Sequence, residues 1–402
     1  MRHLIEKYLN KLQSQGLANK ENVVFLAQDA EIVSNKPIKD DVLKLSRVFE
    51  NMNINTILFS EPLEPYKGII NEITRYDYLC KEENKIIPMD CETRTFFHDI
   101  PVIDELSPGE ITRALSHRKS AIIRNKGIVT YGTVTPEQAF VSFSSTCFST
   151  FIKYFFDSLI YFEKHYSEGL VLDETYIKNF NEIIHSLQPL PESFRPLTSK
   201  SPECEDDVIK MLSEAGRAVV ECRLVDSYFG NISYIYKDKI YISQTGSSMD
   251  ELECSIDAVP LDGSSSVGIT ASSELSAHKR IYEETGDNAI LHGHPKFSVI
   301  MSLYCEKRDC EYYHSRDVCH KSCRQKRYIR DIPIVSGEIG TGPTGLMNTV
   351  PKKMKEGKGV IVYGHGVFTS GRDDFQRPFN MLINIENICR EEYFIKVNNI
   401  IL

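Results

Sequence analysis

The sequence repeats one long segment, and this repeat constrains the fold more than any other feature. Residues 358–394 align without a gap on residues 119–155. The matched pairs are, in order, Gly366 with Gly127, Thr369 with Thr130, Gly371 with Gly132, Phe379 with Phe140, and Tyr393 with Tyr154. Glycines and large aromatic residues at the same places in both segments indicate that each segment builds the same local structure.

Two shorter matches precede the long one in both halves. Asp-Ile-Pro-Ile at 331–334 resembles Asp-Ile-Pro-Val at 99–102, and a helix-then-strand pattern at 281–291 resembles that at 48–58. Three matches in the same order indicate an internal duplication rather than chance similarity between unrelated units.

The length of the chain, 402 residues, exceeds what one ordinary hydrophobic core supports. We therefore predict two tandem domains, at residues 1–185 and 204–402, joined by a Pro- and Ser-rich linker at 186–203. Apolar residues at helical spacing predict a leading helix over 1–21 and another helix from Cys204. Alternating strands follow over 234–243, and this order predicts a layered α/β or α+β domain with a mainly antiparallel sheet.

The stretch 272–294 predicts a helix and then a strand that ends in two histidines. Glu274 and His278 are four residues apart on one helical face, and Gly286 is placed to end the helix. His292 and His294 are two apart on the strand and point to the same side. Two imidazoles with a carboxylate are a suitable ligand set for a divalent metal, whereas the plainer interpretation is a strand end with two surface histidines.

A third histidine, His365, ends another apolar strand, and all three histidines are missing from the first copy. Phe59 and Glu61 stand where the second half has His292 and His294, and Lys126 stands in place of His365. A phenyl ring or an ammonium group cannot replace an imidazole ligand. We therefore expect the first copy to be chemically silent.

Three polar loops have the composition of an anion site, namely Gly230 with Asn231, Thr245 with Gly246, and Ser272 with Ser273. Glycine lets the backbone approach an anion closely, and the positive end of the helix after Ser273 favours negative charge. Each loop taken alone is also an ordinary turn or helix cap.

Charge and hydropathy exclude some function classes. The net charge of −9 leaves no basic excess to neutralise nucleic-acid phosphates, so we expect no nucleic-acid binding. No signal-peptide pattern or long apolar span is present, and we expect a cytoplasmic protein that does not enter a membrane. The 11 cysteines are then expected to be reduced thiols or metal ligands.

Four cysteines are close together in the sequence, at Cys305, Cys310, Cys319 and Cys323. Their spacing allows a second, structural zinc site or an iron–sulfur cluster, and free thiols in a loop are the alternative.

The C-terminal half, from about Asp206 to Tyr393, resembles the class II aldolase and adducin family, which includes L-fuculose-1-phosphate aldolase. The resemblance is carried by Gly-Asn-Ile-Ser at 230–233, Thr-Gly at 245–246, Ser-Ser-Glu at 272–274, His-x-His at 292–294 and Gly-His-Gly-Val-Phe-Thr at 364–369. The N-terminal half then looks like a degenerate, truncated copy. The resemblance implies a three-layer α/β/α sandwich with a central, mainly antiparallel sheet, duplicated as two tandem domains.

The resemblance also implies roles for the motif residues. Zinc, or another divalent ion such as Fe²⁺, Mn²⁺ or Co²⁺, would be held by His292, His294 and His365, with Glu274 as catalytic acid/base and resting ligand. The phosphate of a sugar substrate would be bound by Gly230, Asn231, Thr245, Gly246, Ser272 and Ser273. A tyrosine after the His-x-His motif protonates the product in the family's aldolases, and Tyr312 and Tyr313 are candidates here.

The expected function is a metal-dependent, aldolase-type lyase that cleaves a phosphorylated ketose through an enediolate. Dehydration or epimerisation of a sugar phosphate are alternatives within the family, and a non-catalytic scaffold like adducin is an alternative of another class. We also expect a homo-oligomer in which the two halves pack with pseudo-symmetry.

Overall fold

The computed structural model describes residues 1–75, 84–189, 196–198, 200–226, 228–264, 266–313, 315–357 and 359–401. Contacts divide the chain into two compact units, Met1–Gln188 and Pro189–Leu402. The division falls within the predicted linker at 186–203, of which residues 190–195 and 199 lie outside the described residues. The predicted limits 1–185 and 204–402 stay predictions. Within the described part, no helix is long and apolar enough to cross a membrane.

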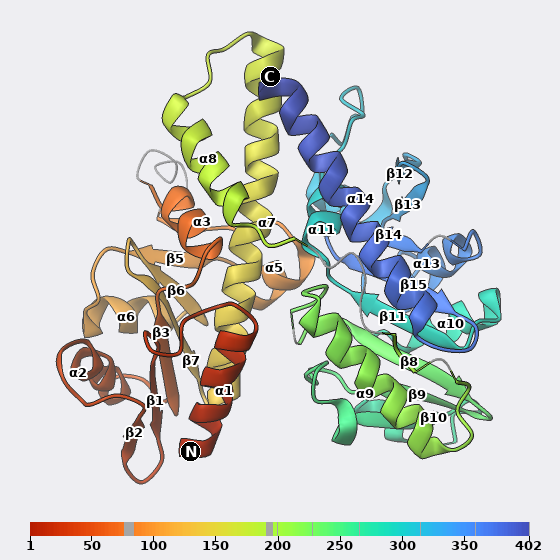
Figure 1. Cartoon of the computed structure of the whole chain (residues 1–402), viewed down its shortest axis with the longest axis horizontal. Coiled ribbons are helices and arrows are strands. Elements are labelled where there is room, and N and C mark those ends of the chain that lie inside the picture. Colours follow the sequence, from red (N-terminus) through yellow and green to blue (C-terminus); the bar gives the residue numbers. More distant parts are fainter. Residues whose placement is uncertain are drawn as a thin grey trace. The chain divides into compact units, whose positions relative to one another are not determined.

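The N-terminal unit is built on a sheet with strand order β2-β1-β3-β7-β6-β5-β4 (Figure 1). The strands are β1 (Val24–Gln28), β2 (Ile32–Ser34), β3 (Thr56–Ser60), β4 (Lys85–Ile86), β5 (Ile100–Ile103), β6 (Ser120–Ile123) and β7 (Gly127–Gly132). The helices are α1 (Arg2–Ser14), α2 (Asp40–Ser46), η1 (Arg47–Glu50), α3 (Tyr66–Ile73), α5 (Cys91–Phe97), α6 (Pro108–Leu115), α7 (Pro136–Glu168) and α8 (Glu174–Ser186). Helices α2 and α6 pack on one face of the sheet, and α1 and α7 cover the other.

The C-terminal unit has strand order β10-β9-β8-β11-β15-β14-β13-β12. The strands are β8 (Asn231–Tyr236), β9 (Lys239–Ser243), β10 (Ile256–Pro260), β11 (Ala289–Gly293), β12 (Arg327–Ile329), β13 (Ile332–Val335), β14 (Val360–Val362) and β15 (Gly366–Gly371). The helices are α9 (Glu205–Glu221), η2 (Leu252–Cys254), η3 (Ser266–Ile269), α10 (Leu275–Thr285), α11 (Lys296–Leu303), α12 (Arg316–Ser322), α13 (Leu346–Met354) and α14 (Gln376–Ile401). Helices α10 and α13 pack on one face, and α9, α11 and α14 on the other.

Six consecutive strands correspond between the two sheets. The order β1-β3-β7-β6-β5-β4 in the first unit matches β8-β11-β15-β14-β13-β12 in the second. The register also agrees, because Leu58 faces Thr130 in the first sheet and Leu291 faces Thr369 in the second. In each unit one neighbouring pair is parallel, β5 with β6 and β13 with β14, while the other pairs are antiparallel. The predicted fold class, a three-layer α/β/α sandwich present twice, is confirmed.

Local signals explain where the helices end. Gly286 takes the left-handed conformation, with φ of 70°, directly after α10, as its position in the sequence predicts. The leading helix was predicted too long, since α1 ends at Ser14 rather than near residue 21. The reason is Gly16, whose φ of 67° cannot continue a right-handed helix.

Glycine is required at one equivalent place in both units, the first residue of β7 and of β15. A Cβ atom on Gly127 would lie 2.3 Å from the backbone oxygen of Ser60, and one on Gly366 would lie 2.4 Å from that of Gly293. Real Cβ atoms do not approach backbone that closely. The shared glycine therefore serves the close approach of two strands, which both copies need.

Gly127→Ala is predicted to lower the free energy of unfolding by about 2–4 kcal/mol, because the new methyl group meets backbone and the φ of 142° suits only glycine. Gly109→Ala is the matched control in the same unit, since a Cβ there has open space around it. Denaturant unfolding of the two variants measures the difference. Equal stability of both variants would contradict the close approach.

Candidate metal and catalytic site

The central strand β11 carries the first two histidines. It lies between β8 and β15, with His292 opposite Asn231 on one side and Phe368 on the other. His294 follows directly after the strand. Only 1% of the surface of His292 and 2% of that of His294 is exposed, so the plainer interpretation of a strand end with surface histidines is wrong.

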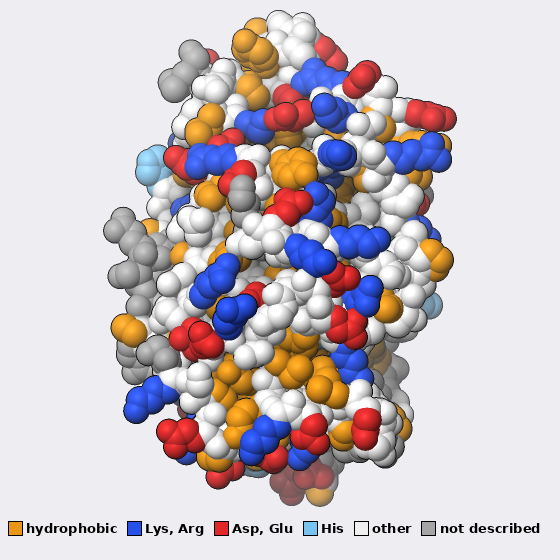
Figure 2. Space-filling view, turned by 90° about the vertical axis from the view of Figure 1, so that its right-hand side faces the viewer, with side chains coloured by type: hydrophobic (Ala, Val, Ile, Leu, Met, Phe, Trp, Pro, Cys, Tyr) orange, Lys and Arg blue, Asp and Glu red, His pale blue; other side chains and the backbone are white. Residues whose placement is uncertain are grey.

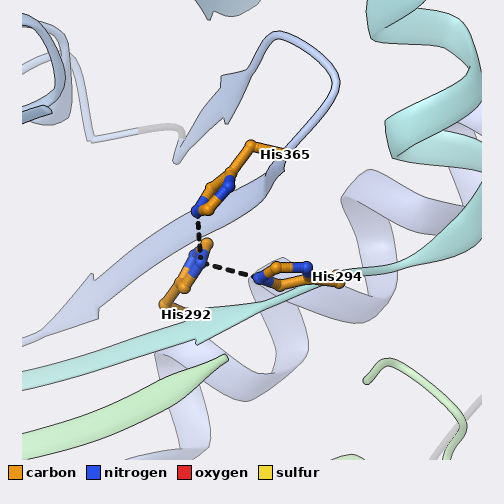
Figure 3. Close-up of side chains that lie close together, drawn as sticks. All are labelled: His292, His294 and His365. Atoms are coloured by element: carbon orange, nitrogen blue, oxygen red, sulfur yellow. Dashed lines mark hydrogen bonds between the residues drawn. The ribbon is translucent and has the colours of Figure 1, made fainter. Parts of the chain in front are cut away.

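His365 comes from the turn between β14 and β15. Gly364 takes a φ of 61° in this turn, and its N–H donates to the hydroxyl of Ser302 on α11 over 2.8 Å. The turn directs His365 at the other two rings, as Figure 3 shows. Its Nε2 lies 3.2 Å from Nε2 of His292, which lies 3.0 Å from Nε2 of His294.

The protonation of these rings follows from their surroundings. His292 Nδ1 lies 3.0 Å from the carbonyl oxygen of Val367, so Nδ1 carries the proton and Nε2 presents its lone pair to the other rings. Burial lowers the pKa of His294 well below its usual value, and charge on His292 or His365 would lower it further. Neutral imidazole is the form that binds a metal.

Glu274, at the N-terminal end of α10, completes the group. Its Oε1 lies 2.9 Å from His365 Nε2, and its Oε2 accepts a hydrogen bond from Asn231 Nδ2 over 2.7 Å. Burial alone would raise the pKa of this carboxyl group. Positive charge on His292 when that ring is protonated, followed by the hydrogen bonds from His365 and Asn231, outweighs burial and holds the pKa of Glu274 well below its usual range. The carboxylate is therefore ionised at neutral pH.

The residues present fit a divalent metal. Ligand atoms of His292, His294 and His365 all lie within 4.8 Å of one another, and the carboxylate of Glu274 lies beside them. Zinc–nitrogen bonds of about 2.0–2.1 Å in tetrahedral geometry place ligand nitrogens roughly 3.3 Å apart, close to the separations between these rings. Nδ1 of His294 is buried and has no hydrogen-bond partner in the described part of the chain.

Hydrogen bonds join two of the loops that carry the expected phosphate-binding residues. The N–H and hydroxyl of Thr245 donate to the carbonyls of Thr270 and Ala271, which places the turn at Gly246 beside the segment that leads to Ser272. The hydroxyl of Ser272 accepts from the N–H of Glu274. Ser273, Thr245 and Gly246 are exposed, whereas Ser272 is buried.

Asn231 and Gly230 of this set also contact the ligand residues themselves. Asn231 uses its side-chain amide to bind Glu274. Gly230 has a φ of 88°, and a Cβ atom there would lie 2.5 Å from the backbone oxygen of His292. Glycine at this position is therefore needed to let the chain pass β11, whether or not a phosphate binds.

The four clustered cysteines form no disulfide bonds. Cys305 and Cys319 are buried, and Cys310 and Cys323 are partly buried. In the described residues they are not among the groups whose ligand atoms all lie within 4.8 Å of one another. Burial, followed by the neighbouring thiols, raises the pKa of Cys319 to about 11, which keeps it protonated at neutral pH. A second metal or an iron–sulfur cluster at these residues stays a prediction.

Glu386 on α14 is a structural support of the site that the sequence analysis missed. Its carboxylate accepts hydrogen bonds of 2.8 Å from the N–H groups of Phe297 and Ser298 and from the hydroxyl of Ser298. It thereby caps α11, the helix that follows His294. The alignment of residues 358–394 on 119–155 could have revealed it, because a charged Glu386 stands where the first copy has Cys147.

The surface gives no single-sign charge pattern on the face shown in Figure 2. Basic and acidic side chains of the described residues are interspersed there, with hydrophobic side chains between them.

Comparison with known proteins finds a family match for this part of the chain. Residues 210–393 match the family model of the Class II Aldolase and Adducin N-terminal domain. A search of the curated proteins found no match.

Three solved structures illustrate the similarity. L-fuculose-1-phosphate aldolase from Thermus thermophilus is similar over 48% of this chain and 95% of its own, with 20% identity and a TM-score of 0.38. YgbL from Escherichia coli, described as a putative aldolase/epimerase/decarboxylase, is 16% identical over 48% of this chain and 90% of its own, with a TM-score of 0.37. The N-terminal class II aldolase domain of a conserved protein from Thermoplasma acidophilum is 11% identical over 50% and 99%, with a TM-score of 0.35.

Removing the cap on α11 tests the support given by Glu386. Glu386→Ala is predicted to lower the free energy of unfolding by about 3 kcal/mol, because buried donors of Phe297 and Ser298 lose their acceptor. Glu391→Ala on the exposed side of the same helix is the control and is expected to change it by less than about 0.5 kcal/mol. Urea unfolding followed by circular dichroism distinguishes them, and similar values for both would refute the capping role.

Proposed function

We propose that the chain is a divalent-metal-dependent lyase, on the premise that residues 210–393 form a class II aldolase and adducin domain. In this proposal the metal is bound by His292, His294 and His365, with Glu274 as fourth ligand of the resting state. The substrate is a phosphorylated ketose, and the reaction is an aldolase-type cleavage of a carbon–carbon bond.

One comparison carries the proposal. The two units share strand order and register, yet His292, His294 and His365 correspond to Phe59, Glu61 and Lys126 in the first unit. The fold therefore does not need the histidines. Three buried imidazoles that face one another are costly unless they bind something, and a cation is the partner that suits their lone pairs.

The chemistry divides between the metal and the protein. A divalent ion supplies Lewis acidity to a carbonyl oxygen. Glu274, ionised and held by Asn231, would accept the proton of the hydroxyl group on the carbon that becomes the aldehyde, and would return it to the carbon next to the carbonyl once the bond between these two carbons has broken. Its hydrogen bond with His365 keeps the carboxylate at the metal ligands before substrate binds. The buried position of Glu274 excludes bulk water from the proton transfer.

The substrate's phosphate is assigned to the loops at Gly230, Asn231, Thr245, Gly246, Ser272 and Ser273. The exposed hydroxyl of Ser273 and the backbone at Gly246 are neutral donors that open to solvent. Ser272 keeps a hydroxyl proton that is free to donate, because its oxygen accepts from Glu274 N–H. The phosphate would hold the sugar so that its carbonyl reaches the histidines.

The same arrangement suits dehydration of a sugar phosphate, which begins by moving a proton next to a carbonyl. Epimerisation fits less well, because the epimerases of the family have aspartate where Glu274 stands. A scaffold without catalysis has no use for four buried ligand groups. Zinc is the metal we favour, and a homo-oligomer with pseudo-symmetric packing of the two halves stays a prediction.

Metal analysis of the purified protein is expected to give one divalent ion per chain. His292→Ala and His365→Ala are expected to remove it, since two imidazoles no longer fill the site. His185→Ala, at an exposed histidine of α8, is the matched control and is expected to retain the metal. Wild-type protein that binds no zinc, iron, manganese or cobalt at these histidines would overturn the mechanism.

A screen of phosphorylated ketoses is expected to reveal metal-dependent cleavage, which is measured as the release of an aldehyde. Glu274→Gln should lower kcat by about 10²–10⁴-fold while metal stays bound, because the general acid/base is lost. Release of water without a carbon–carbon cleavage would identify a dehydratase instead. Equal rates with the dephosphorylated ketoses would contradict the phosphate assignment, and the absence of any turnover with metal bound would favour the scaffold.

A further inference from the structure

A buried hydrogen-bond network joins α10 to β8 next to the candidate site. Ser233 Oγ lies 2.6 Å from His278 Nδ1 and 2.5 Å from the hydroxyl of Tyr282. Ser233 and His278 are fully buried, and Tyr282 is 7% exposed. Burial lowers the pKa of His278 to about 3, so its ring is neutral at neutral pH.

This network is the second of two parallel links between the same elements. The first is the bond from Asn231 to Glu274. Asn231 and Ser233 are two residues apart and lie on one face of β8, while Glu274 is the N-cap residue of α10 and stands four residues before His278. The N–H of His278 also donates to the backbone carbonyl of Glu274 over 3.1 Å. Any shift of His278 is therefore transmitted to Glu274 through one turn of helix.

The first unit shows what the fold itself needs at these places. Leu26 faces Ile57 where Ser233 faces Ile290, so Leu26 corresponds to Ser233. By the alignment of the helices, Leu45 corresponds to His278 and Phe49 to Tyr282. Leu26 and Leu45 are buried in one apolar cluster, and Phe49 packs against it.

The matching carboxylate in the first unit is also different. Asp41 corresponds to Glu274, but its side chain is 55% exposed and pairs with Lys44 on the surface. In the first unit, therefore, the helix and strand are joined by apolar packing, and the carboxylate of Asp41 is exposed. In the second unit they are joined by hydrogen bonds, and the carboxylate of Glu274 is buried against the histidines.

Energetics favour a role beyond folding for the polar version. Burying hydroxyl and imidazole groups costs free energy, and apolar residues of similar volume often replace such groups without loss of stability. His278 Nε2 is buried with no hydrogen-bond partner in the described part of the chain, which adds to the cost. What hydrogen bonds add over apolar packing is direction, because they fix the rotation of α10 relative to β8.

We propose that Ser233 and His278 are positioning residues that fix α10 on β8, so that the carboxylate of Glu274 stays aimed at His365 and His292. This assignment rests on the proposed function. The hydrogen bonds of Ser233 and His278 lead to the ligand group through Glu274 and its helix, while the ring of His278 also lies edge-on to Phe368, which stacks on His292. Their effect on metal binding should therefore depend on the presence of the Glu274 carboxylate.

Cobalt binding to the metal-free protein tests this without a substrate. Co²⁺ affinity, measured by visible absorption against a competing chelator, is expected to fall about 10-fold in His278→Leu, as for loss of other supporting hydrogen bonds. In the Glu274→Ala background the same substitution should change affinity by less than about twofold. The thermal midpoint of metal-free His278→Leu should stay unchanged or rise, because Leu45 fills this place in the first unit.

Two further variants serve as a rescue and as a control. His278→Asn retains a polar group near the position of Nδ1 and is expected to recover most of the affinity. Arg280→Ala, on the exposed side of α10, is the control and should bind Co²⁺ like the unaltered protein.

The outcomes separate the two proposals. The unaltered protein could bind Co²⁺ while His278→Leu lowers the Co²⁺ affinity equally with and without the Glu274 carboxylate, or does not lower it at all. Either result would overturn the positioning role and leave the proposed function standing. No Co²⁺ binding by the unaltered protein would contradict both.

Discussion

The antiparallel pairing of β11 with β15 is the contact on which the rest of the site depends. It places His292 beside Phe368, and it places the turn before β15, which carries His365, next to the end of β11. The strands approach so closely at this point that only glycine fits at Gly366. The same pairing and the same glycine occur in the first unit, where β3 pairs with β7 and Gly127 fills the place. One backbone arrangement thus occurs with two different sets of side chains.

This comparison distinguishes the needs of the fold from those of the chemistry. Positions that are alike in both units, such as Gly127 and Gly366, serve strand packing. Positions that are apolar in one unit and polar in the other, such as Leu45 and His278, are not fixed by the packing of the fold. Several such differences lie beside Glu274 and the three histidines, and the supporting residue Glu386 also differs, with Cys147 as its counterpart.

Much of the fold could be predicted because the signals are local or repeated. Hydrophobic spacing and Gly286 give α10, and the duplication predicts two like domains before any strand pairing is known. The end of α1 was misplaced because a single glycine, Gly16, outweighs the helical spacing on either side. The group of Glu274, His292, His294 and His365 was assembled from motifs, and their ligand atoms do lie together. The link from Ser233 to His278 and the cap from Glu386 were not predicted, because each joins elements whose docking is set by tertiary packing.

The most direct measurement is anomalous X-ray diffraction at the zinc absorption edge, from crystals of the whole chain grown with zinc. We predict a strong anomalous peak among Nε2 of His292, Nε2 of His294, Nε2 of His365 and the carboxylate of Glu274. We also predict no peak among Phe59, Glu61 and Lys126 of the first unit. Zinc-bound crystals without a peak at the histidines, or with an equal peak in the first unit, would contradict the claim that the second copy alone keeps the metal chemistry.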